Sequence, residues 1–469
     1  MSMADVRRLV DGDGGRFIYV AAALAALNGL LFGFDTGIIS GAFLYIQDAF
    51  VMSPLMEGIV VSGAMAGAAL GAAVGGRLSD RLGRRRLILL GAGVFFAGSF
   101  LMAVAPSVPV LVAGRLIDGV AIGFASIVGP LYISEIAPPR IRGALTSLNQ
   151  LMVTVGILAS YFVNYAFADA GAWRWMLGAG MVPAVVLAVG MLKMPESPRW
   201  LYERGREDEA RAVLRRTRQG GVEDELAEIE ETVQKQSGTG LSDLVEPWMR
   251  PALIVGLGLA VFQQVTGINA VMYYAPTVLE STGFGDVTSI LATVGIGAVN
   301  VIMTVVAIAL IDRVGRRALL LVGIGGMVTT LGVLGAVFYL PGFDGIVGWA
   351  ATGSLMLFVA FFAIGLGPVF WLLASEIYPL SVRGSAMGLV TVANWLANLI
   401  VSLAFPMLRS SVGQSWTFWL FGACSVVALA FSYRYVPETK GRSLEAIEAD
   451  LRENVGTTPA GAVGEGSDD

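Results

Sequence analysis

The chain has 469 residues, of which 55% are hydrophobic and only 14% are charged. Because soluble proteins average about 25% charged residues, this composition is typical of an integral membrane protein and argues against a soluble enzyme. The net charge of −5 gives no reason to expect a nucleic-acid partner, the lone cysteine excludes an intramolecular disulfide, and the absence of histidine removes the usual proton carrier.

Long apolar stretches recur from end to end of the chain. Each is long enough, at about 20 residues or more, for a helix to cross a hydrocarbon core roughly 30 Å thick. Backbone amides find no water in lipid, so these stretches predict an all-α membrane protein. The first stretch is too long for the core of a cleaved signal peptide, and we expect it to stay in the membrane. Twelve transmembrane helices are predicted, with approximate cores at 17–44, 56–78, 87–105, 108–134, 144–167, 173–194, 251–280, 287–311, 318–340, 347–375, 384–408 and 415–435.

The basic residues are distributed unevenly over the connecting segments. Of the 31 lysines and arginines, Arg174 and Arg409 fall on one side of the membrane and Arg115 falls inside a span, whereas all the others fall on the opposite side. Cytoplasmic segments are rich in basic residues, which predicts that both termini are cytoplasmic. We expect a multi-pass monomer of the plasma or inner membrane, in contact with lipid.

Three charged motifs occur twice, about half a chain apart. LSDRLGRR at 78–85 reappears as LIDRVGRR at 310–317, SEIAP at 134–138 as SEIYP at 375–379, and PES at 195–197 as PET at 437–439. Since six spans fall in each copy, we predict two parallel-repeat six-helix bundles, the arrangement of the major facilitator fold, with a substrate site between them. The predicted domains are an N-terminal bundle (1–194), a cytoplasmic linker (195–250), a C-terminal bundle (251–436) and a cytoplasmic tail (437–469).

The linker is rich in glutamate and arginine. Apolar residues at helical spacing, such as Leu226 and Ile229, predict short amphipathic helices on the cytoplasmic face, although a disordered linker also fits this composition. The last thirty or so residues are rich in small and polar residues, which predicts disorder for most of the tail.

The repeated motifs are expected where helices leave the membrane and turn sharply. Glycine permits close backbone approach there, and arginines can meet carboxylates or phospholipid headgroups. We predict ion-pair clusters that latch the outward-open state; charged helix ends that only anchor to lipid are the alternative. The predicted members are Asp80, Arg84, Glu135 and Arg142 in the first half, Asp312, Arg316, Glu376 and Arg383 in the second, and Glu196 and Arg199 at the start of the linker.

Taken together and in this order, the motifs resemble the sugar porter family of the major facilitator superfamily, which includes the glucose facilitators and the bacterial xylose and galactose proton symporters. The resemblance covers about residues 15–445. It implies a secondary transporter of a monosaccharide that works by alternating access, with no cofactor and no metal. The matching motifs are GFDTG at 33–37, DRxGRR at 80–85 and 312–317, PESPR at 195–199, QQVTGIN at 263–269, GLGPVFW at 365–371 and PETKG at 437–441.

A sugar presents hydroxyl groups and apolar ring faces, so its site needs amides and flat aromatic rings in an apolar cavity. Gln263, Gln264 and Asn269 lie within two turns of the seventh span, where an amide that faced lipid would be costly. Any one of these amides could instead form a helix–helix hydrogen bond. The resemblance implies that the sugar is held by Gln150, Gln263, Gln264, Asn269, Asn300 and Asn394 and covered by Trp371.

Further residues are expected to line or gate the cavity, namely Ile157, Tyr273, Trp395 and Asn398. Xylose-specific relatives tend to carry glutamine at the positions of Ile157 and Asn394, so the resemblance favours a hexose over a pentose. The segment 365–368, which holds two glycines and a proline, would let the outer half of the tenth span bend, although a static kink fits equally well.

Asp35 in the first span and Arg115 in the fourth lie in apolar sequence. An unpaired charge there is expensive, so we expect the two side chains to pair. Within the family, proton symporters keep aspartate at the position of Asp35, whereas passive glucose facilitators have asparagine. Protonation of Asp35 would release Arg115 and permit the inward swing; a permanent structural ion pair is the alternative.

The sequence therefore predicts a proton symporter that imports a hexose. A passive sugar uniporter would share every feature except the use of Asp35, and a transporter-like sugar sensor would need a longer signalling tail. An enzyme is not expected, because the sequence has no Gly-Lys dipeptide for a phosphate-binding loop and no metal-ligand or nucleophile–base constellation.

Overall fold

The computed structural model describes residues 15–218, 220–236, 246–339, 346–379 and 382–441. Over these residues, twelve helical segments are long and apolar enough to cross a membrane, which confirms the predicted all-α, twelve-helix fold. Most of the predicted disordered tail lies outside the described residues. The first six spans are α2 (Gly15–Ala49), α3 (Pro54–Leu82), α4 (Arg84–Ala103), α5 (Val108–Ile136), α6 (Arg142–Ala168) and the pair α7 (Trp173–Gly178) and α8 (Met181–Met191).

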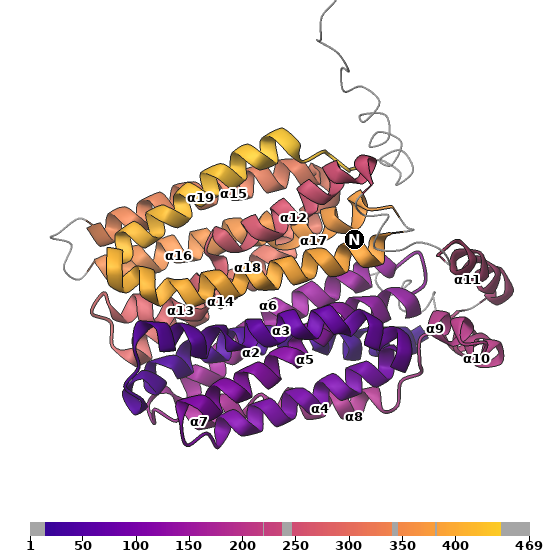
Figure 1. The fold of residues 1–469 in the computed structure, drawn as a ribbon, viewed down its shortest axis with the longest axis horizontal. Coiled ribbons are helices and arrows are strands. Elements are labelled where there is room, and N and C mark those ends of the chain that lie inside the picture. The colour runs from indigo at the N-terminus through magenta and orange to yellow at the C-terminus, as the bar shows by residue number, and fades with distance from the viewer. Residues whose placement is uncertain (1–14, 219, 237–245, 340–345, 380–381, 442–469) are drawn as a thin grey trace, which may run out of the picture.

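The second six spans follow the linker. They are the pair α12 (Arg250–Val265) and α13 (Ile268–Glu280), then α14 (Asp286–Val314), α15 (Arg316–Tyr339), the pair α16 (Val347–Ile364) and α17 (Leu366–Ile377), α18 (Arg383–Val412) and α19 (Gln414–Tyr435). A short 3₁₀ turn, Pro247–Met249, leads into α12. Figure 1 shows two bundles side by side, the first in indigo to magenta and the second in pink to yellow. Across the two bundles α3 packs on α18, α6 on α14, and α2 on α13.

Small residues allow the helices of one bundle to approach closely, as is common between membrane helices. A Cβ atom added at Gly119 of α5 would meet the carbonyl oxygen of Ala64 in α3, and one added at Gly156 of α6 would meet that of Leu30 in α2. These contacts pack α5, the helix of Arg115, closely on α3, and α2, the helix of Asp35, closely on α6.

The seventh and tenth spans are broken near their middles. The seventh breaks at Gly267, whose φ of 88° lies in the left-handed region that favours glycine. The tenth breaks at Gly365, between α16 and α17. There the side chain of Gln263 donates a hydrogen bond of 3.0 Å to the Leu366 carbonyl. A side chain beside the break of the seventh span thus binds a backbone carbonyl at the break of the tenth. Broken helices near the midplane are where transporter folds place polar ligands.

The linker forms three helices, α9 (Pro198–Glu203), α10 (Glu207–Thr217) and α11 (Val222–Gln236), which lie at one end of the molecule in Figure 1. They share a small core that includes Trp200, Leu214 and Leu226. Arg218 ties this core to the first bundle, because its guanidinium donates to the carbonyls of Ile136 and Ala137 at the end of α5. We call the membrane side that carries these helices the insert side.

Candidate functional site

Four amide side chains meet where the seventh span breaks. The Oε1 atom of Gln263 accepts from Nδ2 of Asn394 at 2.9 Å and from Nε2 of Gln264 at 3.2 Å. Gln264 also donates to Oδ1 of Asn394 at 3.2 Å, and its own oxygen accepts from Asn269 at 2.6 Å. Gln263, Gln264 and Asn394 are buried. Helices α12, α13 and α18 thus bring together four of the six amides predicted from the sequence. In this state the amides satisfy one another.

The other predicted binding residues lie on different helices. Asn300 in α14 is buried and Gln150 in α6 is half-buried, and neither side chain has a hydrogen-bond partner among the described residues. Trp371 in α17 is half-buried, and its ring packs on that of Phe370 with centroids 4.6 Å apart. Asn300 and Gln150 therefore offer free donors and acceptors from both halves.

The predicted lining residues make contacts within and between the halves. The Tyr273 hydroxyl accepts a 3.3 Å hydrogen bond from Asn398. Trp395 in α18 packs on Phe32 in α2, with ring centroids 5.2 Å apart, and its indole N–H is buried without a partner in the part of the chain that the structure describes. Ile157 is a buried core residue of α6. Trp395 thus joins the amide-bearing helix to the first half.

Asp35 and Arg115 form an ion pair with both side chains almost completely buried, as the sequence predicts. The Arg115 guanidinium donates from Nη1 to the Asp35 carboxylate and from Nη2 to the Val61 carbonyl at 3.2 Å. The ion pair therefore connects α2 to α5, and the second bond of Arg115 reaches α3.

Sequence reasoning missed a third ionisable residue at this site. Asp118 lies one turn after Arg115 in α5 and is 1% exposed. Its carboxyl group is in hydrogen-bonding contact with the Asp35 carboxyl group and with the Ser99 hydroxyl. A second ionisable residue three positions after Arg115, inside the same apolar span, was the signal that could have found it.

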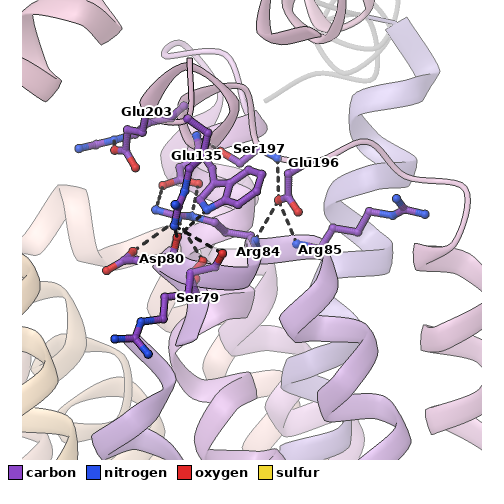
Figure 2. A network of polar contacts seen from close by, with 12 residues as sticks. Ser79, Asp80, Arg84, Arg85, Glu135, Glu196, Ser197 and Glu203 are labelled. Carbon is purple, nitrogen blue, oxygen red and sulfur yellow. Dashed lines mark hydrogen bonds and ion pairs between the residues drawn. The ribbon is translucent and has the colours of Figure 1, made fainter. Parts of the chain in front are cut away.

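On the insert side of the first half, Arg84 is the centre of an ion cluster, shown in Figure 2. Its guanidinium binds Glu135 through two bonds of 2.9 Å and approaches Asp80 at 3.4 Å. The Glu196 carboxylate accepts from the backbone N–H groups of Arg84 and Arg85 at 2.9 and 3.0 Å. Four of the predicted latch residues are thus brought together within one half.

The second half has the matching cluster. Arg316 pairs with Glu376 at 3.0 Å and with Asp312 at 3.1 Å. Glu438, which the sequence analysis did not select, accepts from the backbone N–H groups of Arg316 and Arg317. Partial burial acts to raise the pKa of Glu438, but the backbone N–H groups of Lys440, Arg316 and Arg317 outweigh it and lower its pKa below the usual value for glutamate.

Three predicted latch residues lie outside these clusters. Arg142 is exposed and makes no ion pair with any described residue. Arg383 donates to the Tyr378 carbonyl at 3.0 Å, and Arg199 pairs with Glu203 one turn along α9. Among the residues described, neither cluster crosses from one half to the other.

The halves do meet on the side away from the insert. The Tyr161 hydroxyl of α6 donates to the Met272 carbonyl of α13 at 3.1 Å, and the rings of Phe43 and Tyr274 contact edge to face at 5.7 Å. A separate apolar cluster of Leu44, Ala168 and Ile290 joins α2 and α6 to α14. The two halves are therefore in contact on the side opposite the insert.

Comparison with known protein families gives a match over most of the chain. The family described as "Sugar (and other) transporter" matches residues 21–451. Three curated relatives are similar over nearly the whole chain. A glucose transporter, GlcP, of Staphylococcus epidermidis is 44% identical, covering 93% of this chain and 98% of its own. A D-xylose transporter of Levilactobacillus brevis is 43% identical (95% and 97%), and the galactose-proton symporter of Escherichia coli (strain K12) is 42% identical (91% and 93%).

Solved structures show the same similarity. The xylose transporter XylE from E. coli, in a structure described as a partially occluded inward-open conformation, superposes with a TM-score of 0.80 at 33% identity, covering 91% of this chain and 99% of that one. A structure of XylE described as a proton:xylose symporter bound to 6-bromo-6-deoxy-D-glucose has a TM-score of 0.78 at 34% identity, with coverage of 92% and 99%.

Proposed function

Since the chain belongs to the sugar porter family of the major facilitator superfamily, we propose that it imports a hexose together with protons by alternating access. It is a multi-pass membrane protein and a monosaccharide transporter, not an enzyme. The resemblance predicted from its motifs is confirmed. The direction of transport, the coupling ion and the choice of sugar are the proposal.

The buried pair of Asp35 and Arg115 is the observation on which proton coupling depends. The pair links α2 to α5, and removing one partner of such a pair typically costs about 3–5 kcal/mol. Protonation of Asp35 would neutralise its carboxylate and free the two helices to move relative to each other. One pH unit supplies about 1.4 kcal/mol and a 100 mV potential about 2.3 kcal/mol per charge, so their sum is comparable to the energy of the pair.

The amide cluster is proposed as the sugar site. Gln263, Gln264 and Asn394 bond to one another, so sugar hydroxyls would exchange with existing hydrogen bonds of similar strength. Asn300 and Gln150 would add donors from α14 and α6, and Trp371 would cover the ring. A site shared by both halves is what alternating access requires.

We propose that the insert side is cytoplasmic, because it carries almost all of the basic residues. The contacts between the halves on the opposite side support the assignment of the described state as inward-facing. In the outward-facing state Arg142 and Arg383 would join the carboxylates of the two ion clusters and latch the halves on the insert side.

A hexose is proposed because Ile157 and Asn394 stand where xylose-specific relatives tend to have glutamine. The curated relatives themselves include a glucose, a xylose and a galactose carrier. Competition of unlabelled glucose, galactose and xylose against labelled glucose uptake ranks these sugars, and a xylose affinity above that for both hexoses would contradict the choice.

The decisive experiment is uptake of labelled glucose into proteoliposomes, with and without an imposed pH gradient and potential, for the wild type and Asp35→Asn. We expect the wild type to accumulate sugar above equilibrium, and Asp35→Asn to lose accumulation while retaining exchange. Asp169→Asn is the matched control, since Asp169 is exposed in the loop after α6. Equilibration without accumulation in every variant would make the protein a passive facilitator.

A further inference from the structure

Asp118 is the buried ionisable group that the proposed mechanism does not use. It is 1% exposed, and its Oδ1 atom has no hydrogen-bond donor within the described residues. The polar side chains in contact with its carboxyl group are the Ser99 hydroxyl and the Asp35 carboxyl. Two ionised carboxylates cannot hydrogen-bond to each other, because neither has a proton to donate.

The charges around Asp118 do not balance if both carboxylates are ionised. The helices packed on α5 include α2, α3, α4 and α6. Within the described part of the chain, the only cation near the two carboxyl groups is Arg115, one turn before Asp118 on α5. The spans of α3, α4 and α6 carry no charged side chain at this depth, and α13 contributes the Tyr273 hydroxyl. Two carboxylates would thus share one guanidinium, a net negative charge that is costly inside a membrane protein.

The hydrogen bonds of Arg115 decide which carboxyl group stays charged. Its guanidinium donates to Asp35 and to the Val61 carbonyl, whereas no bond from Arg115 to Asp118 occurs in the described structure. Asp35 is therefore bonded to the cation, whereas Arg115 acts on Asp118 through its charge without a hydrogen bond.

We infer that Asp118 carries a resident proton and donates it in a hydrogen bond to the Asp35 carboxylate, so that the site is neutral while Arg115 and Asp35 are paired. This inference deepens the proposed function and rests on it. Asp118 acts as a positioning residue: by donating to ionised Asp35 it holds that group in its charged form, and so sets the pH at which Asp35 accepts the transported proton. Because Asp118 and Arg115 lie on one helix, a pair between them could not replace the link from α2 to α5.

The resident proton can be detected without any transport. Infrared spectra of the purified protein at neutral pH should contain the carbonyl band of a protonated carboxylic acid, and this band should be lost in Asp118→Asn. Asp169→Asn, which removes an exposed carboxylate, should leave the band unchanged. If the wild type and Asp118→Asn show no difference in this band, Asp118 is ionised and the inference is wrong.

The pH dependence of glucose uptake tests the role of Asp118. Asparagine can still donate to Asp35, so Asp118→Asn should keep the wild-type pH midpoint. Leucine cannot donate, so Asp118→Leu should shift the midpoint upward by about one to two pH units, which is what a hydrogen bond to a charged group contributes. A downward shift in both variants would mean that Asp118 is ionised, and no shift in Asp118→Leu would mean that it only fills space; either result overturns the inference.

Failure of the proposed function would look different. The wild type itself would then show no accumulation of sugar above equilibrium, whatever residue occupies position 118. The infrared comparison would still report on the proton of Asp118, and it also remains informative if Asp118→Leu does not fold.

Discussion

Glu196 and Glu438 occupy equivalent places in the two halves. Each accepts hydrogen bonds from the backbone N–H groups of two consecutive arginines at the start of a membrane helix. Glu196 caps Arg84 and Arg85 at α4, and Glu438 caps Arg316 and Arg317 at α15. The first N–H groups of a helix have no partner within it and carry partial positive charge, which explains why a carboxylate is placed there twice.

Glu438→Gln should lower the apparent melting temperature in detergent at neutral pH, since loss of the charge at a helix N-terminus costs about 1 kcal/mol. The pKa of Glu438 is lowered in the folded protein, so its stabilisation is present above the pKa of an unfolded glutamate and is lost as the pH falls through the folded value. The difference in melting temperature between wild type and Glu438→Gln should therefore shrink on acidification. A difference that grew at low pH would contradict this account.

Gly83→Ala should destabilise the protein by about 1–3 kcal/mol, measured by thermal unfolding. Gly83 has a φ of 95°, and an added Cβ would collide with the Glu196 carboxylate. Gly76→Ala in α3 is the matched control, because nothing lies within 4 Å of its Cβ position; alanine there should be neutral or stabilise the helix. An equal loss of stability in the two variants would show that a side chain does not strain the turn at Gly83.

Gln264→Ala should raise the KM for glucose about tenfold, because each neutral hydrogen bond contributes about 0.5–1.5 kcal/mol and the amide also orients Asn269 and Asn394. Gln414→Ala, at the start of α19 where its side chain meets Ser281, should leave the KM unchanged. Initial rates of uptake at several glucose concentrations give the KM of each variant. An unchanged KM in Gln264→Ala would remove the amide cluster from the sugar site.

Tyr161→Phe should favour opening on the side away from the insert, because it removes the hydrogen bond to Met272 that joins α6 and α13. Loss of about 0.5–1.5 kcal/mol should raise the open population roughly two- to tenfold. Distances between spin labels placed at positions 169 and 286, in a background with Cys424→Ser, measure that population. Tyr165→Phe alters an exposed tyrosine of the same helix and should leave the distances as in the unchanged background.

Much of the fold could be predicted because lipid imposes its demands on each segment separately. A span must be long, apolar and helical whatever it packs against, and the repeated motifs around Arg84 and Arg316 reveal the two halves directly. The pairing of Asp35 with Arg115 was predictable for the same reason, since two isolated opposite charges in apolar sequence have few other partners.

The sequence by itself determined the number of spans, the two-fold repeat and the family, all of which depend on local composition and on motifs in order. Only the tertiary structure decided that Asp118 lies beside Asp35 and that four amides bond to one another at the breaks of two spans. It also decided that Arg142 and Arg383 lie outside the ion clusters and that Tyr161 joins the two halves. The physical reason is that lipid-facing and protein-facing sides of a membrane helix are both apolar, so the sequence carries little record of how each helix is rotated. Contacts between residues far apart in the chain depend on that rotation.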